Sequence, residues 1–340
     1  MIRWSEEFCA EDRDLLERAA AWQECPSLRD CSPPRLSKVA HEQGLEFATA
    51  VLHDRVLRLS ENRTFLQRVN AIKPAVATDP PLVGIIPGAF YLEHKNTGAD
   101  GEQIATILRS INCCVERVPV ESFGSLAKNA AIIVDWLSHH HEDRVALVSL
   151  SKGSSDLKIA LGLPKAGELF RNVETWVSVS GLPQGTPLVA WLRRQPLRRV
   201  GVRLLLRLRG QRYSVVEELR QEPDGPLATW PSLAPHLRVV HVVSFPLRRH
   251  LAHPWAARAY ERVAPLGPND GGGFLLADVA NLPGTVFPVW GADHYLQPAW
   301  DAGSLLRRTF IAALTPQVDL RQATQSAAQP SKPPANRSTA

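Results

Sequence analysis

A short apolar run that breaks into small polar residues constrains the fold of this 340-residue chain more than any other stretch. Residues 145–148 are rich in valine and leucine and follow a charged turn, which is typical of a buried strand. Residues 157–161 then take up helical spacing. Between them, Ser151 has small residues two positions before and after it. A strand that turns sharply into a helix thrusts its central side chain outward, so Ser151 is predicted to be a nucleophile.

The stretch resembles the nucleophile elbow of the α/β-hydrolase superfamily, whose motif is Gly-x-Ser-x-Gly. Gly153 matches the second glycine, and Ser149 takes the place of the first. The resemblance extends over about residues 80–315. It implies a serine esterase or lipase-like enzyme that forms an acyl-enzyme. The same letters also spell Ser-x-x-Lys of penicillin-recognising enzymes, but the Ser-Asp-Asn and Lys-Thr-Gly motifs of that family do not occur.

Apolar runs alternate with helical patterns over most of the chain, which predicts βαβ units. The fold class is therefore α/β, a mostly parallel central sheet flanked by helices. The predicted strands are 82–91, 113–119, 145–148, 175–183, 237–246 and 285–291. The predicted parts are a helical N-terminal extension (1–78) in which Pro26, Pro33 and Pro34 interrupt the helices, a hydrolase core (79–187 and 236–315), an arginine-rich helical cap (188–235) and a partly disordered tail (316–340).

Two further residues complete a catalytic triad in this reading. Asp270 lies in a glycine-rich turn, and His294 follows the last predicted strand. The chain order Ser151, Asp270, His294 is that of the α/β-hydrolase triad. Asp278 is the alternative acid, although it lies in an apolar, helix-like stretch.

The resemblance also implies an oxyanion hole made of two backbone N–H groups. One belongs to Lys152, the residue after the nucleophile. The other belongs to Ala89 or Phe90, which follow Pro87-Gly88 at the end of the first predicted strand. The alternative for this Pro-Gly is a simple β-turn. The ammonium group of Lys152 has three alternatives, namely a role at the oxyanion, a contact with a substrate carboxylate, or exposure to solvent.

The net charge of +5 comes from one segment. Residues 188–212 contain eight arginines and no acid, and the rest of the chain is near neutral or slightly acidic. A nucleic-acid partner is therefore not predicted. Leucines alternate with arginines from Arg193 to Arg212, so this cap could receive an anionic or acyl substrate or contact an acidic membrane surface. A solvated helix without a ligand is the alternative.

No metal or cofactor is predicted. His139, His140 and His141 point about 100° apart on a helix and cannot share one ion, so they indicate a solvated helix end. The five cysteines lack Cys-x-x-Cys spacing and indicate reduced thiols. His241 is expected in the core, and His250 and His253 could lie near the site.

The leading hypothesis is a cytoplasmic serine hydrolase acting on a carboxylic ester with a largely hydrophobic or acyl part. The N-terminus lacks the apolar core of a signal peptide, and no run of about 18 apolar residues occurs. Thioester hydrolysis and acyl transfer are close variants on the same triad. A non-catalytic protein of the same fold is the alternative from a different class, and Ser149 in place of the first elbow glycine is the feature that supports it.

Overall fold

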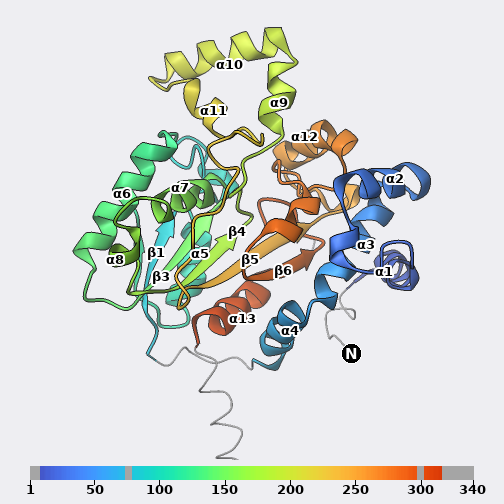
Figure 1. Ribbon diagram of the computed structural model, residues 1–340, viewed down its shortest axis with the longest axis horizontal. Helices are drawn as coiled ribbons and strands as arrows, with labels where there is room; N and C mark the ends of the chain where they lie inside the picture. Colours follow the sequence, from blue (N-terminus) through green and yellow to red (C-terminus); the bar gives the residue numbers. More distant parts are fainter. Residues whose placement is uncertain (1–7, 73–78, 297–301, 316–340) are drawn as a thin grey trace, which may run out of the picture.

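A computed structural model describes residues 8–72, 79–296 and 302–315, in which six parallel strands form the central sheet (Figure 1). The predicted fold class is confirmed. Each strand falls within or close to a predicted run, and the order across the sheet is β2-β1-β3-β4-β5-β6. The strands are β1 (Leu82–Ile86), β2 (Val115–Arg117), β3 (Val145–Leu150), β4 (Val173–Val179), β5 (Arg238–Phe245) and β6 (Thr285–Trp290).

Helices cover both faces of the sheet, so the central strands are apolar on both sides. Val240 and Val242 face one layer, and Val239 and Trp176 face the other. The first layer consists of α4 (Ser60–Ala71), α5 (Glu102–Arg109) and α13 (Ala302–Leu314), and the second of α6 (Leu126–His139), α7 (Lys152–Leu161) and α8 (Ala166–Leu169).

The N-terminal helices pack against the β5–β6 end of the sheet. They are α1 (Ala10–Ala21), α2 (Pro33–Gln43) and α3 (Leu45–Arg58). They form one apolar cluster with Val243 and Trp290, and Phe65 of α4 contacts Phe287 on the opposite face. The expectation that Pro33 and Pro34 interrupt a helix is wrong. Both lie in the first turn of α2, where the missing N–H has no helical partner to lose.

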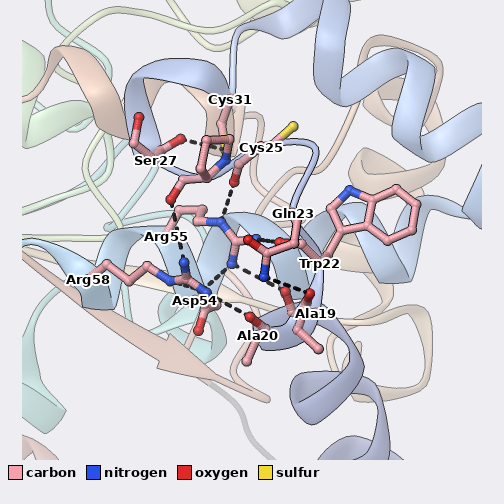
Figure 2. A network of polar contacts seen from close by, with 12 residues as sticks. Ala19, Ala20, Trp22, Gln23, Cys25, Ser27, Cys31, Asp54, Arg55 and Arg58 are labelled. Carbon is pink, nitrogen blue, oxygen red and sulfur yellow. Dashed lines mark hydrogen bonds and ion pairs between the residues drawn. The ribbon is translucent and has the colours of Figure 1, made fainter.

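A buried arginine holds the loop between α1 and α2 (Figure 2). The Arg55 side chain is fully buried, yet its guanidinium donates to the backbone carbonyls of Ala19, Trp22 and Cys25 and pairs with Asp54. Trp22 and Cys25 follow the end of α1, so their carbonyl groups have no helical partner and the buried guanidinium satisfies them. One charged side chain thus holds the chain between the end of α1 and the 3₁₀ helix Leu28–Asp30.

Replacing Arg55 by methionine is expected to lower the free energy of unfolding by about 3–5 kcal/mol, because the carbonyl groups of Trp22 and Cys25 lose their donor and Asp54 loses one of its two arginines. Urea denaturation measures this change. Arg58 is the matched control, since it lies one turn away, is exposed, and also pairs with Asp54 and donates to Ala20 O at 2.7 Å. Arg58→Met is expected to cost less than about 1 kcal/mol. Equal losses in the two variants would contradict this account.

The segment between β4 and β5 forms the cap, which lies at the top in Figure 1. Its helices are α9 (Leu188–Arg193), α10 (Pro196–Leu208) and α11 (Ser214–Glu218). A parallel bridge between Thr186 and Arg220 joins its two ends, and Glu218 accepts the N–H of Leu126 at 2.7 Å. After β5 comes α12 (Pro254–Val263), on which α9 packs. The 3₁₀ helices are Leu28–Asp30, Lys95–Thr97, Arg248–His250, Ala264–Leu266 and Leu276–Asn281.

The sheet order defines where a ligand can bind. The strand β1 pairs with β2 on one side and with β3 on the other. The second strand is therefore added toward one edge of the sheet, and the strands from β3 onward are added toward the opposite edge. Loops diverge at such a switch point and leave a crevice at the carboxyl ends of the strands. Gly88 follows β1 and Ser151 follows β3, so both residues lie at this point.

Candidate active site

Ser151 has the backbone conformation expected of an elbow. Its φ of 47° and ψ of −117° are rare for a residue with a Cβ atom. Its N–H donates to Val179 O at 3.2 Å, and its carbonyl accepts the N–H of Leu182 at 3.0 Å. Gly153 is needed because a Cβ there would lie 2.6 Å from the carbonyl oxygens of Ile86 and Pro87. The close approach of α7 to the end of β1 therefore explains the second glycine of the motif.

The structure accommodates Ser149, which stands in place of the first glycine. The Ser149 hydroxyl lies 2.8 Å from Ser154 Oγ and accepts the indole N–H of Trp176 at 2.7 Å. Ser154 Oγ also lies 2.9 Å from Ser178 Oγ on the neighbouring strand. All four side chains are buried, so a small polar network below the elbow takes up the extra side chain. Ser149 does not obstruct the turn.

The structure brings Ser151, Asp270 and His294 together. His294 Nδ1 lies 2.6 Å from Asp270 Oδ2, and His294 Nε2 lies 3.1 Å from Ser151 Oγ. A carboxylate only accepts, so the proton of the neutral imidazole resides on Nδ1 and Nε2 is free to accept from the serine hydroxyl. His294 and Asp270 are buried, whereas Ser151 is partly exposed.

The glycine-rich turn wraps around the imidazole. Asp270 Oδ1 accepts the N–H groups of Gly272 at 2.7 Å and Phe274 at 3.0 Å, which leaves Oδ2 for the histidine. A Cβ at position 272 would lie 1.9 Å from His294 Cγ, so only glycine fits there. The turn thus fixes both the orientation of the carboxylate and the position of the ring.

The surroundings of His294 favour its charged form. Burial, the largest influence, lowers its pKa, but the charge and hydrogen bond of Asp270 and the charge of Asp293 outweigh burial, so the pKa of His294 lies above its ordinary value. Asp293 accepts the N–H groups of Tyr295 at 2.9 Å and His253 at 3.1 Å. Asp293 was not among the predicted site residues. Its position next to His294 was the only signal in the sequence that pointed to it.

The alternative acid does not contact His294. Asp278 is largely buried, and its Oδ2 accepts a hydrogen bond from the side-chain amide of Gln221 at 2.5 Å. The carboxylate that bonds to the His294 imidazole is that of Asp270. Burial raises the pKa of Asp278 to about 6. Asp278 is therefore a carboxyl group in an apolar stretch, and the geometry favours Asp270 as the acid that orients His294.

The other histidines have separate surroundings. His241 is buried in β5 with its pKa lowered to about 4 by burial. His250 lies 3.1 Å from Asp12 on α1, away from Ser151. His253 is near the site, with its ring 4.3 Å from that of Tyr295, a neighbour of His294.

The Lys152 side chain takes none of the three predicted roles. Its ammonium group is buried and forms an ion pair with Asp156 at 2.6 Å, one helical turn along α7. Asn129 donates to the same carboxylate at 2.9 Å. Burial raises the pKa of Asp156 although both partners stabilise its ionised form. Only the backbone N–H of Lys152 therefore remains a candidate for the oxyanion hole.

A cavity of about 610 Å³ opens at Ser151 and extends beneath the cap. Its walls are mainly apolar and include Leu182, Leu188 and Leu206. In the described part of the chain, six non-glycine residues have positive φ, and four of these line the cavity: Phe90, Ser151, Ser180 and Leu296. Strained backbone of this kind concentrates at functional sites.

The loop after β1 contributes to the same cavity. Ala89 and Phe90 both line it. The N–H of Phe90 is engaged, because it donates to Ser122 O at 2.8 Å, and the N–H of Gly88 donates to Ala99 O at 2.8 Å. Phe90 is therefore not available as an oxyanion donor, and the choice left open between the two residues falls on Ala89.

No metal-binding cluster occurs among residues 8–72, 79–296 and 302–315. His139 and His141 bond to carbonyl groups of their own helix end, as at 2.8 Å between His139 Nδ1 and Asp135 O, whereas the partly buried His140 lies 2.9 Å from Asp143 and 3.2 Å from Glu116 of β2. The five cysteines are all free thiols. No helix within the described ranges has the length and apolarity needed to cross a membrane. The tail (316–340) lies outside the described residues.

The all-parallel sheet and the strand–serine–helix elbow at its carboxyl edge are those of the α/β-hydrolase fold. No family model and no curated protein match the chain. Among solved structures, a metagenomic carboxyl esterase is 16% identical over 75% of this chain and 79% of its own, with a TM-score of 0.47. A Bacillus licheniformis lipase in its mature form is 15% identical over 66% and 90%, with a TM-score of 0.43. An extracellular alpha/beta-hydrolase from a Paenibacillus species is 12% identical over 70% and 100%, with a TM-score of 0.42.

Proposed function

We propose that this chain is a serine hydrolase that cleaves a carboxylic ester through an acyl-enzyme. The observation that carries this proposal is the hydrogen-bonded series from Asp270 through His294 to Ser151 at the mouth of a largely apolar cavity. Nucleophile, base and orienting acid lie in the order and at the distances that acyl transfer requires.

In the proposed mechanism, His294 Nε2 accepts the hydroxyl proton of Ser151 as Oγ attacks the ester carbonyl. Asp270 holds the imidazole in the required tautomer and stabilises the charge that develops on it. His294 then donates the proton to the leaving alcohol. Water, activated by the same histidine, releases the acid from Ser151 and restores the free enzyme.

Two backbone N–H groups are proposed to stabilise the oxyanion. The N–H of Lys152 lies at the start of α7, where a helix leaves its first N–H groups without partners and carries a partial positive charge. The N–H of Ala89 belongs to the loop after β1, which passes beside the nucleophile, since a Cβ on the adjacent Gly88 would lie 3.4 Å from Ser151 Cβ. Donors of this kind contribute about 3–4 kcal/mol each to transition-state stability.

The cavity supports a substrate with an apolar acyl or alcohol part, because apolar residues form most of its wall. Thioester hydrolysis and acyl transfer use the same acyl-enzyme. The direct test is hydrolysis of 4-nitrophenyl esters from acetate to laurate by the purified chain, with Ser151→Ala as the control. Turnover of one or more esters that the variant lacks supports the proposal, and equal rates in both proteins contradict it.

The dependence of activity on pH follows from His294. Only neutral imidazole accepts the Ser151 proton, so activity falls when pH drops through the pKa of His294. Since that pKa is raised, the acid limb of kcat/KM is expected above pH 6.5, the ordinary value. Asp293→Asn is expected to move this limb to lower pH, because it removes a carboxylate that favours the charged ring. A limb that stays fixed or moves upward in this variant would contradict the prediction.

We also propose a peripheral contact between the cap and an acidic membrane surface. Leu197, Val200, Leu204 and Leu208 recur at helical spacing on α10 and are exposed, by 88% for Leu197. Arginines flank this stripe on the same helix. An apolar stripe between cationic side chains suits a surface of anionic lipid headgroups.

Flotation with vesicles of phosphatidylserine and phosphatidylcholine (3:7) measures this contact. Leu204→Glu is expected to weaken binding about tenfold, because it removes apolar area and adds repulsion. The matched control is Leu266→Glu, at an exposed leucine outside the cap. Equal binding to pure phosphatidylcholine vesicles, or equal loss in both variants, would contradict the proposal.

A further inference from the structure

The cavity that holds Ser151 has an unbalanced charge. Three arginines line it, Arg209 at the end of α10 and Arg258 and Arg262 on α12. No aspartate or glutamate is among its lining residues in the described part of the chain. The wall is otherwise mostly apolar, so the cavity combines an apolar surface with an excess of positive charge.

The arginines of α12 face the cap. Arg258 and Arg262 are one helical turn apart, and α12 packs beside α9. The Arg262 guanidinium lies 4.4 Å from the centre of the Trp191 ring of α9, and Arg198 of α10 lies 5.1 Å from the same ring. Trp191 also lines the cavity, so these cations gather where the cap meets the core.

In the described part of the chain, carboxylates of the cap pair with Arg193, Arg199 and Arg220, but not with the three arginines that line the cavity. Arg193 forms ion pairs with Glu217 and Glu222, both at 2.5 Å. Within residues 8–72, 79–296 and 302–315, no ion pair joins Arg209, Arg258 or Arg262 to a carboxylate. Burial first, and then the charges of Arg198 and Arg258, lower the pKa of Arg262. Like charges held together in this way are relieved when an anion binds between them.

We propose that the ester substrate carries a phosphate or carboxylate group, which Arg258 and Arg262 bind while the apolar part occupies the cavity. This inference rests on the proposed ester hydrolysis at Ser151 and names the substrate class. Guanidinium groups suit the task, because their N–H donors match phosphate and carboxylate oxygens in pairs. The ester carbonyl then reaches Ser151 with the anion held at the rim.

Two pairs of esters with equal chains test the inference below their micelle-forming concentrations. The first pair is 1-decanoylglycerol and 1-decanoylglycerol 3-phosphate, in which the charge is on the alcohol side. The second pair is 4-nitrophenyl decanoate and the mono-4-nitrophenyl ester of sebacic acid, in which a carboxylate ends the acyl chain. The measured quantity is the ratio of kcat/KM for the anionic ester to that for its neutral partner.

The wild type is expected to prefer the anionic ester about tenfold or more in one pair or both. The double variant Arg258→Gln, Arg262→Gln is expected to lower that ratio at least tenfold, since charged hydrogen bonds of this kind commonly contribute that much. The control Arg207→Gln changes an exposed arginine of α10 that does not line the cavity, and its ratio is expected to match that of the wild type.

A wild-type ratio of one or less in both pairs overturns the inference and leaves the proposed hydrolysis intact. An unchanged ratio in the double variant also overturns it. Absence of turnover for all four esters, together with no labelling of Ser151 by a fluorophosphonate, instead overturns the proposed function and this inference with it. Repeating the assay with the 1-oleoyl phosphate ester held in phosphatidylcholine vesicles separates the sources of the anion. Hydrolysis there supports a membrane lipid, and hydrolysis of only the free decanoyl ester supports a dissolved one.

Discussion

Ser151→Ala is expected to lower kcat/KM for ester hydrolysis by about 10⁴-fold or more, the largest effect of any single substitution in this chain. The loss follows from the geometry, because Ser151 Oγ is the atom that His294 Nε2 contacts at 3.1 Å. Initial rates with the best 4-nitrophenyl ester measure the loss. Circular dichroism verifies that the variant is folded.

The matched control for this substitution is Ser180→Ala. Ser180 also lines the cavity and also has a positive φ, of 45°, but His294 does not contact it. Its loss is expected to stay within about tenfold, since it removes no member of the triad. If Ser180→Ala abolished activity and Ser151→Ala did not, the nucleophile would have been assigned to the wrong residue.

Asp270→Asn is expected to lower kcat by about 10³–10⁴-fold. The amide keeps an oxygen for the N–H groups of Gly272 and Phe274, so the turn stays closed, but it cannot stabilise a charged His294 or fix its tautomer. Steady-state kinetics at a pH above the acid limb measure the effect. The loss is expected in kcat, because the carboxylate acts on the transition state rather than on substrate binding.

Asp278→Asn distinguishes the two candidate acids. Asp278 is buried on Gln221 and lies apart from the imidazole, so this variant is expected to retain activity within about tenfold. Loss of activity in Asp278→Asn with retention in Asp270→Asn would reverse the assignment.

The sequence indicated the sheet and the meeting of Ser151, Asp270 and His294, because both follow from local patterns. Five of the six strands are mostly apolar runs, which are recognisable without tertiary information, whereas β2 is the short Val-Glu-Arg segment at the edge of the sheet. Ser151, Asp270 and His294 each lie in or beside a recognisable turn, at the edge of the sheet where the parallel strands end. Their chain order could therefore be compared with a known arrangement before any distance was known.

Other features depend on contacts between distant residues and could not be predicted. The ion pair of Lys152 follows from a partner one turn away on a buried helix face, and the burial of that face is a tertiary property. The fit of Ser149 depends on Trp176 and Ser178 of another strand. Pro33 and Pro34 are equally consistent with a break and with a helix start, and the packing of α2 decides between them.

The arginine cluster at the cavity also needed the structure. The sequence placed the excess charge within the cap, yet two of the three cavity arginines, Arg258 and Arg262, belong to α12 of the core. They line the cavity together with the cap because α9 packs on α12. An anionic substrate was one of several open alternatives for the cap, and the absence of acidic lining residues in the described part of the chain now favours it.

Labelling with a fluorophosphonate tests the central claim, an activated Ser151, most directly. The purified wild type is expected to be labelled, with the adduct on Ser151 by mass spectrometry, and Ser151→Ala and His294→Ala are expected to lose the label while remaining folded. Labelling that persists in Ser151→Ala, or a folded wild type that takes up no label, would contradict that claim.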